Sequence, residues 1–187
     1  MTRASQIENR NFLSPTGFKF ILTRFPKVSF FCNEANIPDL DFGIANQPTY
    51  LKDIPIPGDK IVFGDFNLRF LVDEDLTNYM AIQNWIRGLG YPEKLGQFRE
   101  LHESDSYGRN TYANKGHNIY SDGTLQVLTS SQLPNFQVQF KDLFPFSLST
   151  LTFDATATDI QYFTADVSFK YTIYNITDLS GNPLYPL

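Results

Sequence analysis

The hydrophobic period changes abruptly within residues 66–89, and this change limits the folds open to the chain. The first part carries apolar side chains at every second position, Phe66, Leu68, Phe70 and Val72, which predicts a strand with one buried face. The next apolar side chains recur at helical spacings and share one helix face: Tyr79, Ile82, Ile86 and Leu89. Because a short amphipathic helix is not stable alone, we expect this face to lie across a sheet.

Both ends of this predicted helix carry termination signals. Arg87 lies in its last turn, and Gly88, Gly90 and Pro92 end it. The residues before it can accept hydrogen bonds from its unpaired N–H groups: Asp73, Glu74, Asp75 and Thr77. These acids also resemble the opening of a calcium loop, but Asn78 replaces the turn glycine and Asn84 replaces the bidentate glutamate. We therefore interpret them as helix caps.

Alternation dominates the rest of the chain. It predicts strands at 18–22 and 28–32, which we expect to pair as a hairpin, and further strands around 125–127 and 136–140, with a turn at 144–147. The longest run closes the chain and has an apolar side: Phe163, Ala165, Val167, Phe169, Tyr171 and Ile173. Its other side is small, polar and mixed in charge: Thr164, Asp166, Ser168, Lys170, Thr172 and Tyr174. The fold class predicted is mainly β, an antiparallel β-sandwich or barrel with one flanking α-helix.

Residues 33–60 differ from their surroundings because prolines and glycines are spread along them. A proline has no N–H to donate, so this stretch is not a central strand throughout; it is a long extended hairpin or an irregular excursion. Its apolar side chains would be costly to expose: Ile37, Leu40, Phe42, Ile44, Tyr50, Leu51, Ile54 and Ile56. We favour the interpretation that these side chains contact another chain, and the alternative is that they pack on their own domain.

The length of 187 residues fits a single domain. We expect a flexible N-terminal arm at residues 1–16 and one domain at 17–187, with the projecting loop 33–60 and a polar insertion at about 92–123. No secretory signal or membrane-spanning run is evident, which predicts a cytoplasmic protein with no membrane insertion.

Composition and motifs argue against several functions. A net charge of −5 excludes a protein that grips nucleic acid through a surplus of lysine and arginine. The single cysteine, Cys32, lies in an apolar run and is interpreted as a buried thiol rather than a nucleophile. His102 and His117 lack metal-ligand spacing, and no phosphate-binding or nucleophile motif occurs. We expect no enzyme, no metal and no cofactor.

Three segments, taken together, carry a resemblance to a known family. They are FFCNEANIP at 30–38, PGDKIVFGDFNLRFLVDED with the helix that ends in NWI, and the stretch that begins FKDLFPF at Phe140 and ends near Ile176. In order and spacing they resemble the tail tube proteins of contractile-tailed bacteriophages. The likeness covers most of residues 18–176, and about 92–121 depart from it by being longer and more polar. This departure leaves open a main tube subunit or a tube-like baseplate or terminator relative.

The resemblance implies a β-sandwich with a flanking helix, six copies of which close into a ring whose sheets join as an inner barrel. It also implies that rings stack through the loop 33–60 and that viral DNA passes through the lumen without specific binding. Sheath and baseplate or terminator proteins would be partners, and the protein would be part of a virion tail assembled in the host cytoplasm. An acidic chain suits such a lumen. The candidate lumen-facing residues are Thr164, Asp166, Ser168, Lys170 and Thr172.

Two other functions stay open at this point. One is a carbohydrate or small-molecule binding β domain of a tail or baseplate, with Tyr107, Tyr112 and Tyr120 as an aromatic platform. The other is a hydrolase with paired carboxylates, whose pairing is spatial and not visible in a sequence.

Overall fold

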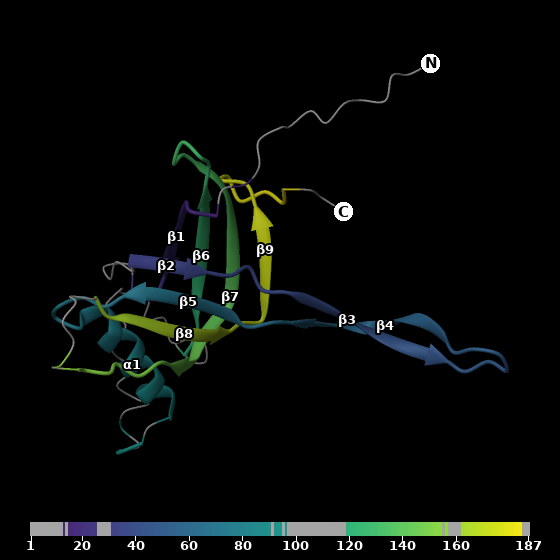
Figure 1. Ribbon diagram of the computed structural model, residues 1–187, viewed down its shortest axis with the longest axis horizontal. Coiled ribbons are helices and arrows are strands. Elements are labelled where there is room, and N and C mark those ends of the chain that lie inside the picture. Colours follow the sequence, from purple (N-terminus) through teal and green to yellow (C-terminus); the bar gives the residue numbers. More distant parts are fainter. Residues whose placement is uncertain are drawn as a thin grey trace.

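Two antiparallel sheets that share one strand build the domain. The computed structural model describes residues 13, 15–25, 31–90, 92–94, 96, 119–154, 156 and 162–184. The first sheet contains, in order, β1 (Phe18–Leu22), β6 (Ser121–Leu128), β7 (Pro134–Leu148) and β9 (Ile173–Thr177). The second contains β2 (Phe31–Ala35), β5 (Phe66–Leu71), β8 (Thr164–Lys170) and the last part of β7. Their strands cross in Figure 1, as in barrel-like sandwiches.

Strand β7 joins the sheets because it bends near its middle. Up to Leu143 it pairs with β6 and β9, and from Phe144 it pairs with β8. Asp142 has a φ of 54°, and the register with β8 shifts between Pro145 and Ser147. The turn predicted at 144–147 is therefore wrong. The proline there marks an irregular point at which the strand changes sheet, as prolines do inside sheets.

Aromatic rings fill the space between the sheets. Phe66 lies at their centre, with its ring centroid 4.5 Å from that of Phe140, 5.2 Å from that of Phe20 and 5.9 Å from that of Phe169. These side chains come from the inward positions of β5, β7, β1 and β8, and all are buried. The alternation predicted for these strands is confirmed. Clustered phenylalanines supply large apolar area with favourable ring geometry.

The helix α1 (Thr77–Gly90) packs against this core. Its predicted face is confirmed, since Ile82 is buried and Tyr79, Ile86 and Leu89 are partly buried against the core. Trp85 was missed. It is fully buried, its ring lies 6.4 Å from that of Phe169, and its Nε1 donates to the Ile119 carbonyl at 3.0 Å.

Asn78, not the acids before it, fastens the start of α1. Its Oδ1 accepts from the N–H groups of Asp73 and Tyr79, and its Nδ2 donates to the Leu71 carbonyl at 2.8 Å. The first turn contains no acidic residue. The predicted capping by Asp73, Glu74 and Asp75 is corrected, because the buried amide both accepts and donates, whereas a carboxylate only accepts.

Three other predictions need correction. β1 pairs with β6 and β2 pairs with β5, so they do not form a hairpin with each other. The closing alternation is two strands, since the chain turns at Tyr171 and Thr172 and β9 pairs with β7. β6 begins at Ser121, inside the stretch predicted as polar insertion. The arm 1–16 and the rest of that insertion fall almost wholly outside the described residues, as do Tyr107, Tyr112, His102 and His117.

Within the described ranges, no helix is both long and apolar enough to cross a membrane.

Candidate assembly surfaces

A two-stranded hairpin projects far beyond the two sheets (Figure 1). Its strands are β3 (Leu40–Gln47) and β4 (Ile54–Phe63), which pair only with each other among the described strands. Of the two structures that the sequence left open for 33–60, the extended hairpin is confirmed from Leu40 onwards, whereas residues 33–35 belong to β2 of the second sheet. An isolated two-stranded hairpin is marginally stable in water, so this hairpin needs support from elsewhere.

The hairpin exposes apolar side chains on both of its faces. By register, Leu40 and Phe42 share a face with Ile61, whereas Val62 lies opposite Asp41 on the other face. The tip residues Tyr50 and Leu51 are 101% and 90% exposed. All eight residues that the sequence singled out are exposed: Ile37, Leu40, Phe42, Ile44, Tyr50, Leu51, Ile54 and Ile56. In the part of the chain that the structure describes, these side chains are not buried against their own domain.

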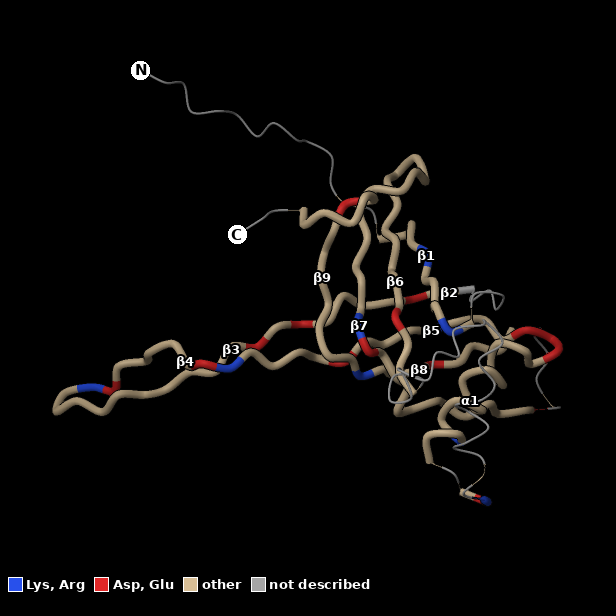
Figure 2. The backbone as a smooth tube through the Cα atoms, turned by 180° about the vertical axis from the view of Figure 1, so that it is seen from behind, with Lys and Arg blue, Asp and Glu red and all other residues tan. Residues whose placement is uncertain are grey.

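Ile61 and Val62 belong to the same surface and were missed, because the projecting loop was predicted to end at Lys60. Both are more than half exposed. Charged residues of both signs interrupt the apolar surface along the hairpin (Figure 2): Asp41, Lys52, Asp53, Asp59 and Lys60. An apolar surface rimmed by polar groups is typical of a protein contact.

Prolines and glycines shape the hairpin. Pro55 and Pro57 lie in β4 opposite Asn46 and Ile44. The missing N–H groups are tolerated because none of the other described strands pairs there. Gly58 lies at a bulge where β3 and β4 approach each other closely, and a Cβ on it would lie 2.5 Å from the Gly43 carbonyl oxygen. Residues 58–60 are part of β4.

An aromatic clasp, formed by Phe63, Tyr171 and Tyr174, holds the root of the hairpin. The ring of Phe63 meets those of Tyr171 and Tyr174 edge-on, at 6.1 and 5.8 Å. The Tyr171 hydroxyl donates to the Gly64 carbonyl at 2.9 Å, and the Tyr174 hydroxyl donates to the Pro38 carbonyl at 3.1 Å. Both tyrosines also touch Phe140 of the core. The clasp therefore ties both strands of the hairpin to the domain.

The Tyr171 hydroxyl stays protonated at neutral pH and can act as this donor. Burial raises its pKa to about 12, and the nearby Tyr174, Asp39 and Asp65 add to the shift. Ionisation would remove the donor and place a negative charge beside these carboxylates.

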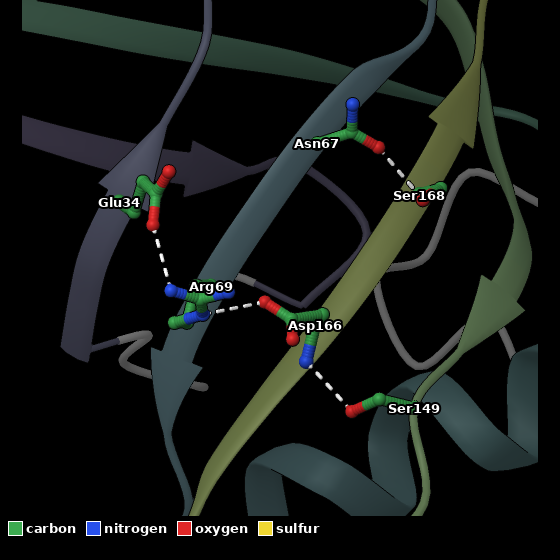
Figure 3. Close-up of polar contacts among 6 residues, drawn as sticks. All are labelled: Glu34, Asn67, Arg69, Ser149, Asp166 and Ser168. Atoms are coloured by element: carbon green, nitrogen blue, oxygen red, sulfur yellow. Dashed lines mark hydrogen bonds and ion pairs between the residues drawn. The ribbon is translucent and has the colours of Figure 1, made fainter.

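The polar side of the second sheet carries a row of ion pairs (Figure 3). Arg69 on β5 lies between the two neighbouring strands, with Glu34 on β2 and Asp166 on β8 at the same level. Its Nη1 lies 2.8 Å from Glu34 Oε2, and its Nε lies 2.7 Å from Asp166 Oδ1. The hydrogen bond that Arg69 donates to Asp166 is the largest cause of a pKa for Arg69 above its ordinary value, and the negative charges of Asp166 and Glu34 add to it.

Other polar groups extend this row. Ser168 Oγ donates to Asn67 Oδ1 at 2.7 Å, and the Asp166 N–H donates to Ser149 Oγ at 2.8 Å. Lys170 forms an ion pair with Asp65 and lies 5.5 Å from the centre of the Phe146 ring. We call this the polar face: Glu34, Asp65, Asn67, Arg69, Phe146, Ser149, Thr164, Asp166, Ser168 and Lys170.

Four of the five predicted lumen residues lie on the polar face, on the outward positions of β8: Thr164, Asp166, Ser168 and Lys170. Thr172 does not, because it lies in the turn before β9, where its N–H donates to the Lys141 carbonyl. The sequence missed the partner strands: nothing in it showed that β5 and β2 would place Arg69 and Glu34 beside Asp166.

Of the predicted aromatic platform, the described part of the chain includes only Tyr120. Its ring packs edge-on against that of Phe144 at 5.7 Å.

Burial raises the pKa of Cys32 to about 11, although a backbone hydrogen bond from Phe20 lowers this pKa slightly. Its thiol is therefore protonated at neutral pH and a weak nucleophile. No group of three or more histidine, cysteine or carboxylate side chains that could hold a metal ion occurs among the residues described.

A model of the phage tail tube protein family matches residues 6–177. The chain belongs to this family. A tail tube protein is a structural part of a virion or of a phage-like tail particle, so a structural role follows from the family. The mainly β fold, with antiparallel sheets and a helix, matches folds of the tail tube type, and the predicted fold class is confirmed.

Solved structures show the same fold at low identity. A cap protein that terminates the tube of the anti-feeding prophage is similar over 95% of this tail tube chain and 98% of its own, with 13% identity and a TM-score of 0.57. A chain from the sheath-tube complex of the extracellular contractile injection system PVC is similar over 91% of this chain and 94% of its own, with 15% identity and a TM-score of 0.54. A chain from the sheath/tube terminator structure of that system is similar over 90% of this chain and 99% of its own, with 14% identity and a TM-score of 0.54. The comparison with curated protein sequences gave no match.

Proposed function

We propose that this tail tube protein forms hexameric rings, and that the rings stack into the inner tube of a contractile tail. The observation that carries the proposal is the hairpin. It is apolar on both faces, stands away from its own domain and is tied to that domain by the aromatic clasp. A surface of this kind is stabilised by contact with sister copies, and a head-to-tail contact of this type generates rings and tubes.

The hairpin would seat on the next ring. The proposed contact residues are Ile37, Leu40, Phe42, Ile44, Tyr50, Leu51, Ile54 and Ile56, to which the structure adds Ile61 and Val62. The most exposed of them are at the tip, so the tip would lie deepest in the neighbouring ring.

Within a ring, free strand edges would pair between copies. Among the described strands, β2 pairs on one side only in the second sheet, and the same is true of β1 in the first sheet. The other edge of the first sheet is already partly covered, because the Leu184 N–H donates to the Ile176 carbonyl on β9. Unpaired edges invite association, and a closed ring removes them.

The polar face would line the lumen, with Thr164, Asp166, Ser168 and Lys170 among its residues. It has no apolar stripe along β8 and its charges are paired across strands. Such a face suits a water-filled conduit through which viral DNA passes without specific binding. Tail sheath, baseplate and terminator proteins would be further partners, assembly would take place in the host cytoplasm, and the protein would perform no catalysis.

Size-exclusion chromatography with multi-angle light scattering tests the proposal, together with negative-stain electron microscopy. We expect species of six subunits or more, and hollow rings or rods in micrographs. A monodisperse monomer at high concentration and near-physiological salt would overturn it.

A further inference from the structure

The positive charges of the polar face are all engaged with carboxylates. Among the described residues the face has two cations, Arg69 and Lys170. Arg69 is held by Glu34 and Asp166, on opposite sides of its strand, and Lys170 by Asp65. The three residues of the Arg69 group therefore carry a net charge of −1.

The arrangement limits what Arg69 can bind. Its Nε donates to Asp166 and its Nη1 donates to Glu34 (Figure 3), so each of the two guanidinium edges that could hold a phosphate in a bidentate contact has already given one donor to a carboxylate. An approaching phosphate would also meet two carboxylates within a few ångströms of the guanidinium, and their charge opposes binding. The two carboxylates thus occupy Arg69 and weaken its attraction for other anions, an effect that we call masking.

Folding stability does not account for these pairs. The side chains are exposed, at 44% for Arg69, 70% for Glu34 and 55% for Asp166. Ion pairs this exposed contribute little to the free energy of unfolding, because water screens them. Their larger effect is on the electrostatic potential above the sheet.

We propose that Glu34 and Asp166 prevent Arg69 from binding phosphate, so that the lumen does not retain a polyanion. The cargo that suits such a surface is a nucleic acid that slides along it without binding. This rests on the proposed function, in which the polar face lines the tube. It assigns Glu34 and Asp166 as residues that determine how cargo passes, and Arg69 as the group that would hold phosphate if it were released.

The test measures the binding of a fluorescent DNA duplex by anisotropy, at about 50 mM salt, where phosphate contacts are strong. The variant E34Q/D166N keeps the shapes of both side chains and leaves Arg69 its full charge. We expect its affinity for the duplex to rise about tenfold or more over wild type, and to fall steeply with added salt. The triple variant E34Q/D166N/R69Q should return to the wild-type level.

A matched control separates masking from net charge. E74Q/D75N removes the same number of charges from exposed acids in the turn before α1, which are not among the residues of the polar face. It should bind DNA no more than about twofold better than wild type. Equal binding by E34Q/D166N and this control would overturn the inference, as would a triple variant that still binds.

Electron microscopy of every variant distinguishes this failure from failure of the proposed function. If rods form and E34Q/D166N does not gain affinity, only the masking is wrong. If the wild-type protein forms no rings or rods, the tubular function is overturned, and the assignment of the polar face to a lumen with it.

Discussion

The Tyr171 hydroxyl makes one of the contacts that connect the hairpin to the core. It donates to the Gly64 carbonyl at the junction of β4 and β5, while its ring touches Phe140. No feature of the sequence indicated this, since Tyr171 was predicted as one more inward position of a long strand. The contact depends on the turn after β8, which brings Tyr171 and Tyr174 together at the root of the hairpin.

We expect Tyr171→Phe to lower the free energy of unfolding by about 1–2 kcal/mol, because the Gly64 carbonyl loses its donor in a partly buried place. Urea unfolding of the non-assembled protein measures this change. Tyr162→Phe, at a tyrosine that is 81% exposed, is the control and should be neutral. An unchanged stability of Tyr171→Phe would show that the clasp holds through its rings alone.

Tyr171 also predicts how stability depends on pH in alkali. Burial raises its pKa from the ordinary 10.0 to about 12 in the folded protein, so between these values the unfolded chain has lost a proton that the folded protein retains. The contribution of Tyr171 to stability is therefore full below pH 10 and is lost as the pH rises through about 12. Urea midpoints from pH 8 to 12 should show this fall, and Tyr171→Phe should reduce it.

The thiol of Cys32, whose pKa is raised from 9.0 to about 11, contributes an earlier fall that Cys32→Ala should remove.

Among the secondary structure elements, α1 depends on one amide that the sequence did not single out. Asn78 is fully buried, joins the end of β5 to the first helical turn and makes three hydrogen bonds. Asn78→Ala should cost about 2–3 kcal/mol, since it leaves a buried carbonyl and two N–H groups without this partner. Asn84→Ala, on the exposed side of the same helix, should be neutral or slightly stabilising because alanine favours helix. Thermal or urea unfolding followed by circular dichroism compares the two.

The elements themselves were predictable wherever one face is buried. The inward positions of β1, β5, β6, β7 and β8 alternate, and their apolar residues are those in the core. Sequence periodicity reports burial, not the direction of the chain. It therefore missed the bend of β7 near Asp142, the turn at Tyr171 and Thr172, and the pairing of β1 with β6. These depend on contacts between strands far apart in the sequence.

The hairpin contains a matched pair of glycines with different tolerances. A Cβ at Gly58 would lie 2.5 Å from the Gly43 carbonyl oxygen, whereas a Cβ at Gly43 would meet only the Lys60 carbonyl oxygen at 3.5 Å. We expect Gly58→Ala to distort the hairpin and reduce assembly at least about fivefold, with little change in the unfolding of the domain. Gly43→Ala should assemble much as wild type does. Light scattering at matched concentrations measures both, and equal assembly by the two variants would contradict the prediction.

The whole molecule combines a well-packed double sheet with a projection that has no core of its own. The polar face was predicted along β8, but its ion pairs were not, because they join residues that are 35 and 97 positions apart. The hairpin surface was more accessible to sequence reasoning. Its prolines limited strand pairing, and its isoleucines had no predicted sheet to cover them. Apolar residues without a cover in their own domain indicate a contact with another chain.

The tip of the hairpin gives the clearest test of stacking. Tyr50 and Leu51 are almost fully exposed and contact little of their own chain, so Tyr50→Ser/Leu51→Ser should leave the unfolding midpoint within about 0.5 kcal/mol of wild type. If the tip seats in the next ring, the same change removes apolar area from that contact once per subunit, and the loss is repeated around the ring. We expect rings to persist while rods disappear in electron micrographs. Leu133→Ser, which is 64% exposed in the turn between β6 and β7, is the control and should still give rods. Rods of normal length from the tip variant would show that stacking depends on another surface.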